Sequence, residues 1–128
     1  MRTLLLSAAA VLALGIGAAQ AGNVSFIGQF GLFPNTATVT QDSDAKSLNW
    51  SEVGQAGASN TATHKQKATG GSLNIALTEQ GGLIVGETLF AGGNSSTTNQ
   101  TAYNGGSNFS STSQFGVGQV AVVNQTSF

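Results

Sequence analysis

Cysteine is absent from this 128-residue chain, and charged residues make up only 7% of it, against ~25% in a typical soluble domain. Without cysteine there are no disulfides, and the single core of a domain of about 100 residues is often only marginally stable. The few basic residues form no patch, so we expect no nucleic-acid partner. Repetition and self-assembly are then the expected sources of stability.

The reactive groups that an enzyme needs are also scarce. His64 is the only histidine, and no acid or nucleophile shares its pattern, so we predict a packed core residue rather than a general base. Asp42 and Asp44 resemble part of a calcium loop, but the glycine and the distal glutamate are missing; we interpret the segment as a charged turn between repeats. The chain is also too short, and lacks the acidic cluster, for a pectate-lyase-like β-helix. The sequence therefore predicts no enzyme activity, no metal site, no cofactor and no small-molecule substrate.

Residues 1–21 have the features of a secretory signal peptide. Met1-Arg2 precedes an apolar run from Leu4 to about Ala18, and Ala19-Gln20-Ala21 forms a small-x-small cleavage site. The run is short for a membrane span, which needs ~20 apolar residues. We therefore expect a secreted chain whose single domain covers residues 22–128.

One pattern recurs four times in that domain: Asn, five residues, Gln, one residue, Gly. Each copy is followed by a second half that closes with Gln, and the step from that Gln to the next Asn is eight residues every time. The repeats cover approximately residues 23–41, 49–66, 74–100 and 108–125, and the third contains about nine additional residues after Gly82. Repetition at this period is typical of chains that stack their repeats.

Within each half, the repeated residues alternate in sequence, as side chains on one face of a strand do. Each repeat therefore predicts strand, glycine-containing arc, strand, and the chain predicts an all-β, amyloid-like parallel β-solenoid of four such rungs, ~4.8 Å apart. We assign the repeated face to the interior, where stacked amides satisfy one another; an unpaired buried amide would cost ~1–3 kcal/mol. The alternative is a β-sandwich with surface amides, which does not explain the constant eight-residue step.

The opposite face carries large apolar residues and is predicted to point outward, which suggests lateral packing or adhesion. Alternatively, the additional segment 83–90 covers this face. The outward residues are Val24, Phe26, Phe30, Trp50, Ile75, Leu77, Phe109 and Phe115.

The second repeat carries a family resemblance. Residues 55–66 read Gln-Ala-Gly-Ala-Ser-Asn-Thr-Ala-Thr-His-Lys-Gln, which is similar to the curlin repeat (Gln-x-Gly-x-x-Asn-x-Ala-x-x-x-Gln) of bacterial curli fibre subunits. The first copy has one extra residue beside Pro34, and the fourth has Gln119 in the Asn place. In the third copy Gln80 and Gly82 match before the additional residues, and Asn94, Ser96 and Gln100 after them.

This resemblance implies a secreted structural subunit of an extracellular amyloid fibre on a Gram-negative cell, which supports adhesion and the biofilm matrix. Its partners would be further copies of itself, other curli-like subunits and an outer-membrane secretion apparatus. The terminal segments Asn23–Gly31 and Gln114–Gln125 would be open edges that pair with neighbouring molecules. The predicted stacking residues are Asn23, Gln29, Gly31, Asn35, Ala37, Gln41, Asn49, Gln55, Gly57, Asn60, Ala62, Gln66, Asn74, Gln80, Gly82, Asn94, Gln100, Asn108, Gln114, Gly116, Gln119, Ala121 and Gln125.

Two alternatives remain open at this stage. The chain is a minor or nucleating component of such a fibre, or it is a monomeric β-solenoid that binds ice or a glycan. The second alternative draws on the outward threonine pairs Thr36/Thr38 and Thr61/Thr63, which lie in register in the first two repeats only.

Overall fold

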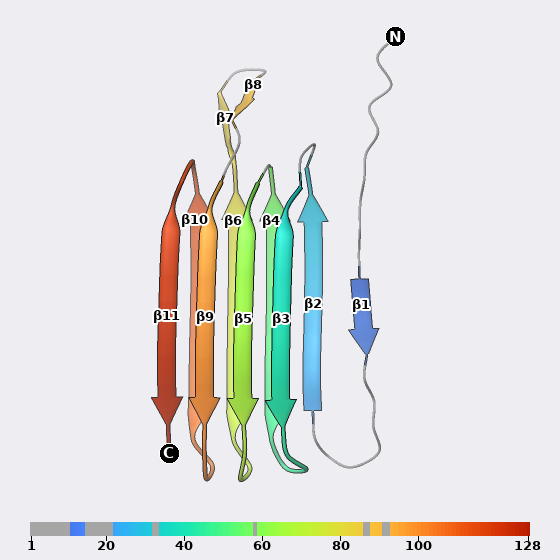
Figure 1. Ribbon diagram of the computed structural model, residues 1–128, viewed down its shortest axis with the longest axis vertical. Coiled ribbons are helices and arrows are strands. Elements are labelled where there is room, and N and C mark those ends of the chain that lie inside the picture. Colours follow the sequence, from blue (N-terminus) through green and yellow to red (C-terminus); the bar gives the residue numbers. More distant parts are fainter. Residues whose placement is uncertain (1–10, 15–21, 32–33, 58, 86–87, 91–92) are drawn as a thin grey trace.

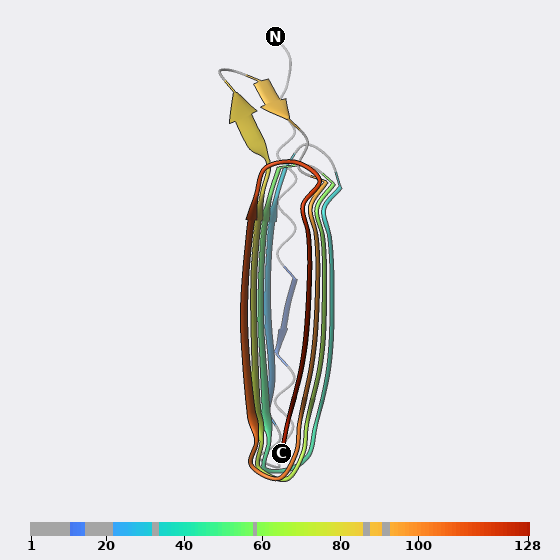
Figure 2. The same ribbon diagram turned by 90° about the vertical axis from the view of Figure 1, so that its left-hand side faces the viewer.

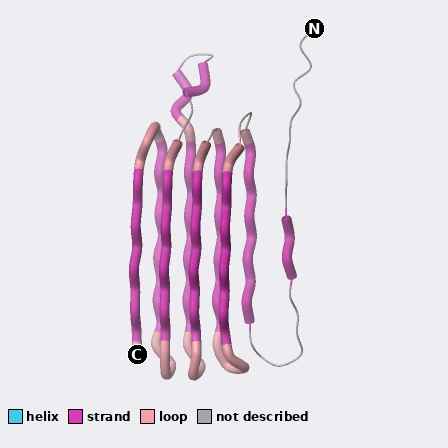
Figure 3. The backbone as a smooth tube through the Cα atoms, in the orientation of Figure 1, coloured by secondary structure: helices cyan, strands magenta, loops and turns pink. Residues whose placement is uncertain are grey.

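The computed structural model describes residues 11–14, 22–31, 34–57, 59–85, 88–90 and 93–128. Within these ranges every regular element is a strand (Figure 3). No helix in the described part of the chain is long and apolar enough to cross a membrane. The prediction of an all-β chain is confirmed.

Eight parallel strands form two sheets, and each repeat contributes one strand to each sheet (Figure 1). Sheet A contains the first strand of every repeat: β2 (Gly22–Phe30), β4 (Leu48–Ala56), β6 (Leu73–Gly81) and β10 (Ser107–Phe115). Sheet B contains the second strands: β3 (Thr36–Ser43), β5 (Thr61–Ala68), β9 (Ser95–Ala102) and β11 (Val120–Ser127). Figure 2 shows the chain running along one sheet and returning along the other, so that successive repeats lie side by side.

The register of the strands follows the sequence repeat. In sheet A, Asn23 pairs with Asn49, which pairs with Asn74, and Asn74 with Asn108. The same holds for the other repeated positions within the strands, and the strands of the third repeat have the same register as the others. The irregularity of the third repeat is therefore confined to the connection between its two strands.

That connection contains the additional residues of the third repeat. Its strands β7 (Leu83–Val85) and β8 (Thr88–Phe90) pair as an antiparallel hairpin, which projects beyond the ends of the two sheets (Figure 1). The additional residues therefore do not lengthen β6 or β9. The hairpin does not cover the outward apolar face either, because Phe109 is 58% and Phe115 65% exposed; the covered-face alternative is wrong.

A short strand, β1 (Val11–Leu14), pairs antiparallel with residues 24–27 of β2. It falls within the predicted signal peptide, whose residues 1–10 and 15–21 lie outside the described part of the chain. The open edge expected at Asn23–Gly31 is partly covered by β1 in the full chain. The expectation applies to a chain that begins at Gly22.

The space between the sheets is filled by small and polar side chains. Val53, Ala62 and Ala76 are at most 1% exposed, and Asn49 and Asn74 are completely buried. Amides thus occupy the interior, and the alternative of surface amides on a β-sandwich is contradicted. The interior is narrow because no large apolar side chain lies between the sheets among the buried residues of the described chain.

Candidate functional site: the amide ladders and the ends of the stack

Three columns of buried amides run through the stack. In the first Gln ladder, each Nε2 donates to Oε1 of the next repeat: Gln29 to Gln55 at 2.6 Å, Gln55 to Gln80 at 2.8 Å and Gln80 to Gln114 at 2.8 Å. The donors all point toward the C-terminal repeat. Identical side chains at one strand spacing can repeat this bond without limit, as in cross-β ladders.

The second Gln ladder lies in sheet B. Gln41 donates to Gln66, Gln66 to Gln100 and Gln100 to Gln125, and each donor–acceptor distance is 2.8 Å. Its donors also point toward the C-terminal repeat.

The Asn ladder runs in the opposite direction. Nδ2 of Asn49 donates to Asn23 at 2.9 Å, Asn74 to Asn49 at 2.9 Å and Asn108 to Asn74 at 3.0 Å. The three ladders together give the stack a chemical polarity along its axis.

The ladder amides of the middle repeats donate a second N–H to the other sheet. Gln66 donates to the carbonyl of Trp50 at 2.9 Å, and Gln55 to that of Thr36 at 3.1 Å. Asn49 donates to the carbonyl of Asp42 at 2.8 Å. Because both N–H groups of Gln55, Gln66 and Asn49 are used, replacing one of these amides leaves several buried groups without a partner.

A fourth column lies at the arcs between the two strands of a repeat. Its side-chain oxygens accept backbone N–H groups: Asn35 from Asn60 at 3.0 Å, Asn60 from Asn94 at 3.2 Å and Asn94 from Gln119 at 3.1 Å. The longer side chain of Gln119 still donates to the carbonyl of Phe115 at 2.7 Å. Glutamine therefore fits the last place in this column.

The arc glycines are required by close contacts or by backbone conformation. A Cβ at Gly31 would lie 1.7 Å from the carbonyl oxygen of Gly57, so no larger residue fits there. Gly57 and Gly116 have φ values of +104° and +131°, which favour glycine. The Gly82 N–H donates to the carbonyl of Ala56 at 3.1 Å. The predicted alanines form one further column of sheet B, in which Ala37 pairs with Ala62 and Ala121 with Ser96.

His64 lies in the interior and is completely buried. Its Nδ1 is 2.6 Å from Oγ of Ser51 and its Nε2 2.7 Å from Oγ1 of Thr78. Burial lowers the pKa of His64 from 6.5 to about 4, so the ring is neutral at neutral pH. Ser51 and Thr78 escaped the sequence analysis as partners of His64, although both lie on the inward-facing parity of their strands.

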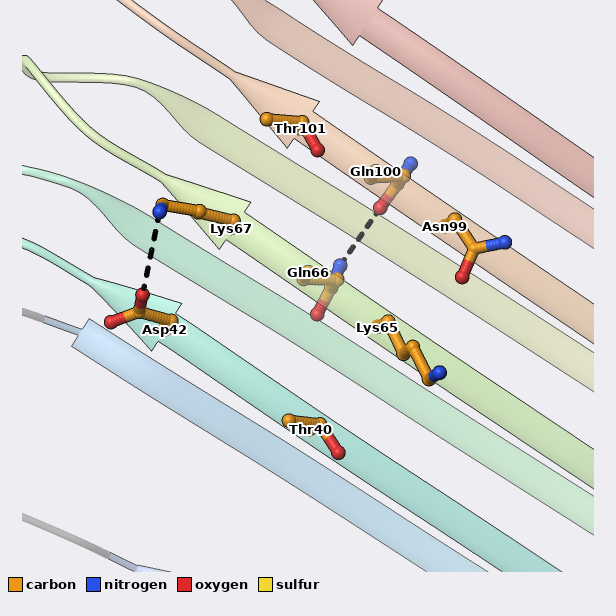
Figure 4. Close-up of a pocket in the computed structure, with 8 residues that line it drawn as sticks. All are labelled: Thr40, Asp42, Lys65, Gln66, Lys67, Asn99, Gln100 and Thr101. Carbon is orange, nitrogen blue, oxygen red and sulfur yellow. Dashed lines mark hydrogen bonds and ion pairs between the residues drawn. The ribbon is translucent and has the colours of Figure 1, made fainter.

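The two aspartates behave differently from each other. Asp44 lies in the turn after β3, where its carboxylate accepts the Ser47 hydroxyl at 2.5 Å and the Gly70 N–H at 2.6 Å. These bonds lower the pKa of Asp44. Asp42 lies instead within β3 on the outer face, with its carboxylate 4.0 Å from Nζ of Lys67 (Figure 4). The turn prediction is right for Asp44 and wrong for Asp42.

The ends of the stack expose complementary groups. In the first repeat, Oε1 of Gln29 and Oε1 of Gln41 accept no hydrogen bond from the described residues. In the last repeat, Gln114 and Gln125 each donate one N–H to a backbone carbonyl, and the other N–H has no acceptor among the described residues. The Asn ladder is reversed, since Oδ1 of Asn108 is the open acceptor. The last repeat therefore offers donors where the first offers acceptors, and the reverse.

The outer faces of the two sheets differ in chemistry. Sheet A exposes aromatic rings, and those of Phe26 and Trp50 lie 5.3 Å apart. Sheet B exposes threonine, lysine and asparagine, as Figure 4 shows for part of β3, β5 and β9. Its threonine column continues from Thr38 and Thr63 to Thr97, but the fourth place holds Val122.

Comparison with models of known protein families and with curated proteins finds no match for this chain. The family assignment therefore stays an interpretation of the repeat spacing.

Proposed function

We propose that this protein is a secreted structural subunit of a curli-like functional amyloid fibre at the bacterial cell surface, without catalytic activity. In this proposal the chain is a four-rung parallel β-solenoid that polymerises end to end, and the fibre supports adhesion and the biofilm matrix. Other curli-like subunits and an outer-membrane secretion apparatus would be its partners. The resemblance of residues 55–66 to the curlin repeat supplies the family.

The complementary ends of the amide ladders carry the proposal. When β10 and β11 of one copy lie against β2 and β3 of the next, Gln114 donates to Gln29 and Gln125 donates to Gln41. Asn23 of the next copy in turn donates to Asn108. All three ladders then continue with their direction unchanged, whereas two identical ends would place carbonyl against carbonyl or N–H against N–H.

The backbone edges favour the same association. β3, β10 and β11 each have a neighbour on one side only, and β2 has the same open edge in a chain that begins at Gly22. Natural proteins usually block such edges with proline, charge or a covering element. The edge residues Thr36–Ser43 and Val120–Ser127 contain one charged side chain, Asp42, and no proline.

The monomeric ice- or glycan-binding alternative is less well supported. Its threonine array needs a regular outer face, and Val120 and Val122 interrupt the array in the fourth repeat. Whether the chain is the major subunit or a nucleating component is a question of rate, and both share the stacking geometry proposed here.

Assembly of purified residues 22–128 from denaturant tests the proposal. We expect concentration-dependent fibres with a ~4.7 Å axial reflection, and slower assembly of a Gln125→Ala variant, which lacks the open N–H of the last repeat. Thr126→Ala is the matched control, because this neighbour on β11 points outward and is exposed. A soluble β-rich monomer at high concentration would contradict the proposal.

A further inference from the structure

The outer faces of the two sheets carry net charges of opposite sign. The charged residues on the described outer face of sheet A are Glu52 and Glu79, and both are exposed. On sheet B they are Asp42, Lys65 and Lys67, of which Asp42 and Lys67 pair with each other. Lys65 has no ion-pair partner in the part of the chain that the structure describes. The unpaired positive charge of Lys65 therefore lies on the opposite side of the molecule from the acidic outer face of sheet A.

The cross-sheet hydrogen bonds show how these charges are aligned. Gln66 of β5 donates to the carbonyl of Trp50 in β4, which sets the adjacent Lys65 level with Ser51. Glu52 is the next residue, ~3.3 Å further along the strand. Because β5 is hydrogen-bonded to β4 and also to β6, it lies between them along the stack, and the two charges are within about one strand spacing, ~4.8 Å, of each other in that direction.

From this alignment we infer that a second copy of the chain docks the outer face of its sheet B on the outer face of sheet A, related by a translation perpendicular to the sheets. The Lys65 ammonium of one copy then meets the Glu52 carboxylate of the other. The inference rests on the proposed function, because it concerns how the proposed filaments associate sideways.

Two further contacts fit the same translation. Asn74 donates to the carbonyl of Lys67, so Lys67 lies at the same position along the strands as the Asn ladder. The half-buried ring of Trp50 is one residue further along β4, so Lys67 of one copy would lie within reach of a cation–π contact with Trp50 of the other. In the last repeat, Gln114 donates to the carbonyl of Ser95, which pairs with Val120. Val120 is 74% exposed and would pack beside Phe115 of the other copy.

The alternative pairings bring like charges together. The charged groups between two copies of sheet A would all be carboxylates, and two copies of sheet B would each bring the net positive charge left by Lys65. Like charges across an interface suppress such pairings. A translational contact leaves one free face of each kind, so it does not close into a dimer. Filaments are therefore expected to stack into layered ribbons.

The contact gains strength from repetition. Nine residues at ~3.3 Å and four strands at ~4.8 Å give each face about 600 Å², so a pair buries near the lower limit of specific interfaces. One exposed ion pair changes the association constant of two subunits by roughly 1.5- to 5-fold. Two filaments that each present ten subunits form ten such pairs, so that even the lower factor multiplies to about 50-fold for the filaments. Single subunits are therefore expected to stay apart while filaments associate.

Charge-swap variants of residues 22–128 test the inference, with ribbon thickness measured by electron microscopy and fibre formation measured by thioflavin fluorescence. Glu52→Lys and Lys65→Glu should each give thinner ribbons at low salt, and the double variant should restore the layers. Glu79→Lys is the control, because it changes the net charge as Glu52→Lys does. Glu79 itself lies near the level of Thr61, at the start of β5 and away from Lys65. All four variants should form fibres at the wild-type rate.

The outcomes separate the two proposals. Ribbons of unchanged thickness in both single variants, or no restoration in the double variant, would overturn the lateral contact and leave end-to-end assembly standing. An equal loss in Glu79→Lys would also overturn it, since net charge would then explain the effect. Absence of fibres from the wild-type chain would overturn the proposed function and this inference together.

Discussion

The inward and outward columns of the same strands follow different rules. Inward, Gln29, Gln55, Gln80 and Gln114 repeat one residue four times, and each amide is bonded to the next. Outward, one column of sheet A reads Val24, Trp50, Ile75 and Phe109. A buried amide needs an identical partner at the same level, whereas an outward side chain can use water. The residues that repeat in the sequence are therefore those that face the interior.

Among the inward columns, the largest loss of stability is expected from a substitution at Gln55. Gln55→Leu removes the acceptor of Gln29 and the donor to both Gln80 and Thr36, and we expect the free energy of unfolding to fall by about 3 kcal/mol or more. Chemical denaturation of freshly prepared monomer measures this change. Thr63→Val, on an outward column that already contains Val122, should change stability by less than about 0.5 kcal/mol. Similar losses in the two variants would break the distinction between the columns.

A pH-dependent effect of similar size is expected at His64. Burial holds its pKa at about 4 in the folded chain against 6.5 when unfolded, so the unfolded chain binds more protons between these values. The stabilising contribution of the neutral ring is complete above pH ~6.5 and is lost as the pH falls toward ~4, a change of about 3 kcal/mol.

Denaturation at several pH values measures this dependence against His64→Thr, which introduces the residue found one repeat later at Thr98. The variant should lack the slope between pH 4 and 6.5. The carboxylates, including Asp44 with its lowered pKa, are common to both proteins and cancel in the difference. Equal slopes would show that His64 is not the group responsible.

The smallest effect is expected at the hairpin of the third repeat. Deletion of residues 84–92 leaves two residues between Gly82 and Asn94, as between Gly57 and Asn60. The ladders do not pass through the hairpin, so we expect stability to change by less than about 1 kcal/mol and fibres still to form. Loss of assembly in this variant would indicate that the hairpin takes part in it.

The buried columns could be predicted from sequence because a stack forces identity at fixed positions. Asn49 and Gln55 are recognisable from spacing alone, and the structure places both in the interior. The direction of the ladders could not be predicted, because an amide at a given position can donate toward either neighbour. In the structure both Gln ladders donate toward the C-terminal repeat and the Asn ladder toward the N-terminal one.

Other features escaped prediction because they depend on neighbours in space. Asp42 and Asp44 look alike in sequence, but only Asp44 reaches the turn after β3, where Ser47 and Gly70 bind its carboxylate. The additional residues of the third repeat carry no alternation that continues β6 or β9. Their pairing as β7 and β8 is set by contacts within the segment itself.

The most direct test of end-to-end stacking is a contact between molecules in the fibre. Residues 22–128 would be prepared in two batches, with ¹⁵N in one and ¹³C in the other, mixed before assembly and studied by solid-state NMR. We expect transfer between the Gln114 side-chain nitrogen of one molecule and the Gln29 side-chain carbonyl carbon of the next. Transfer between Gln114 of both molecules instead, or no transfer between them in well-formed fibres, would contradict head-to-tail continuation of the ladders.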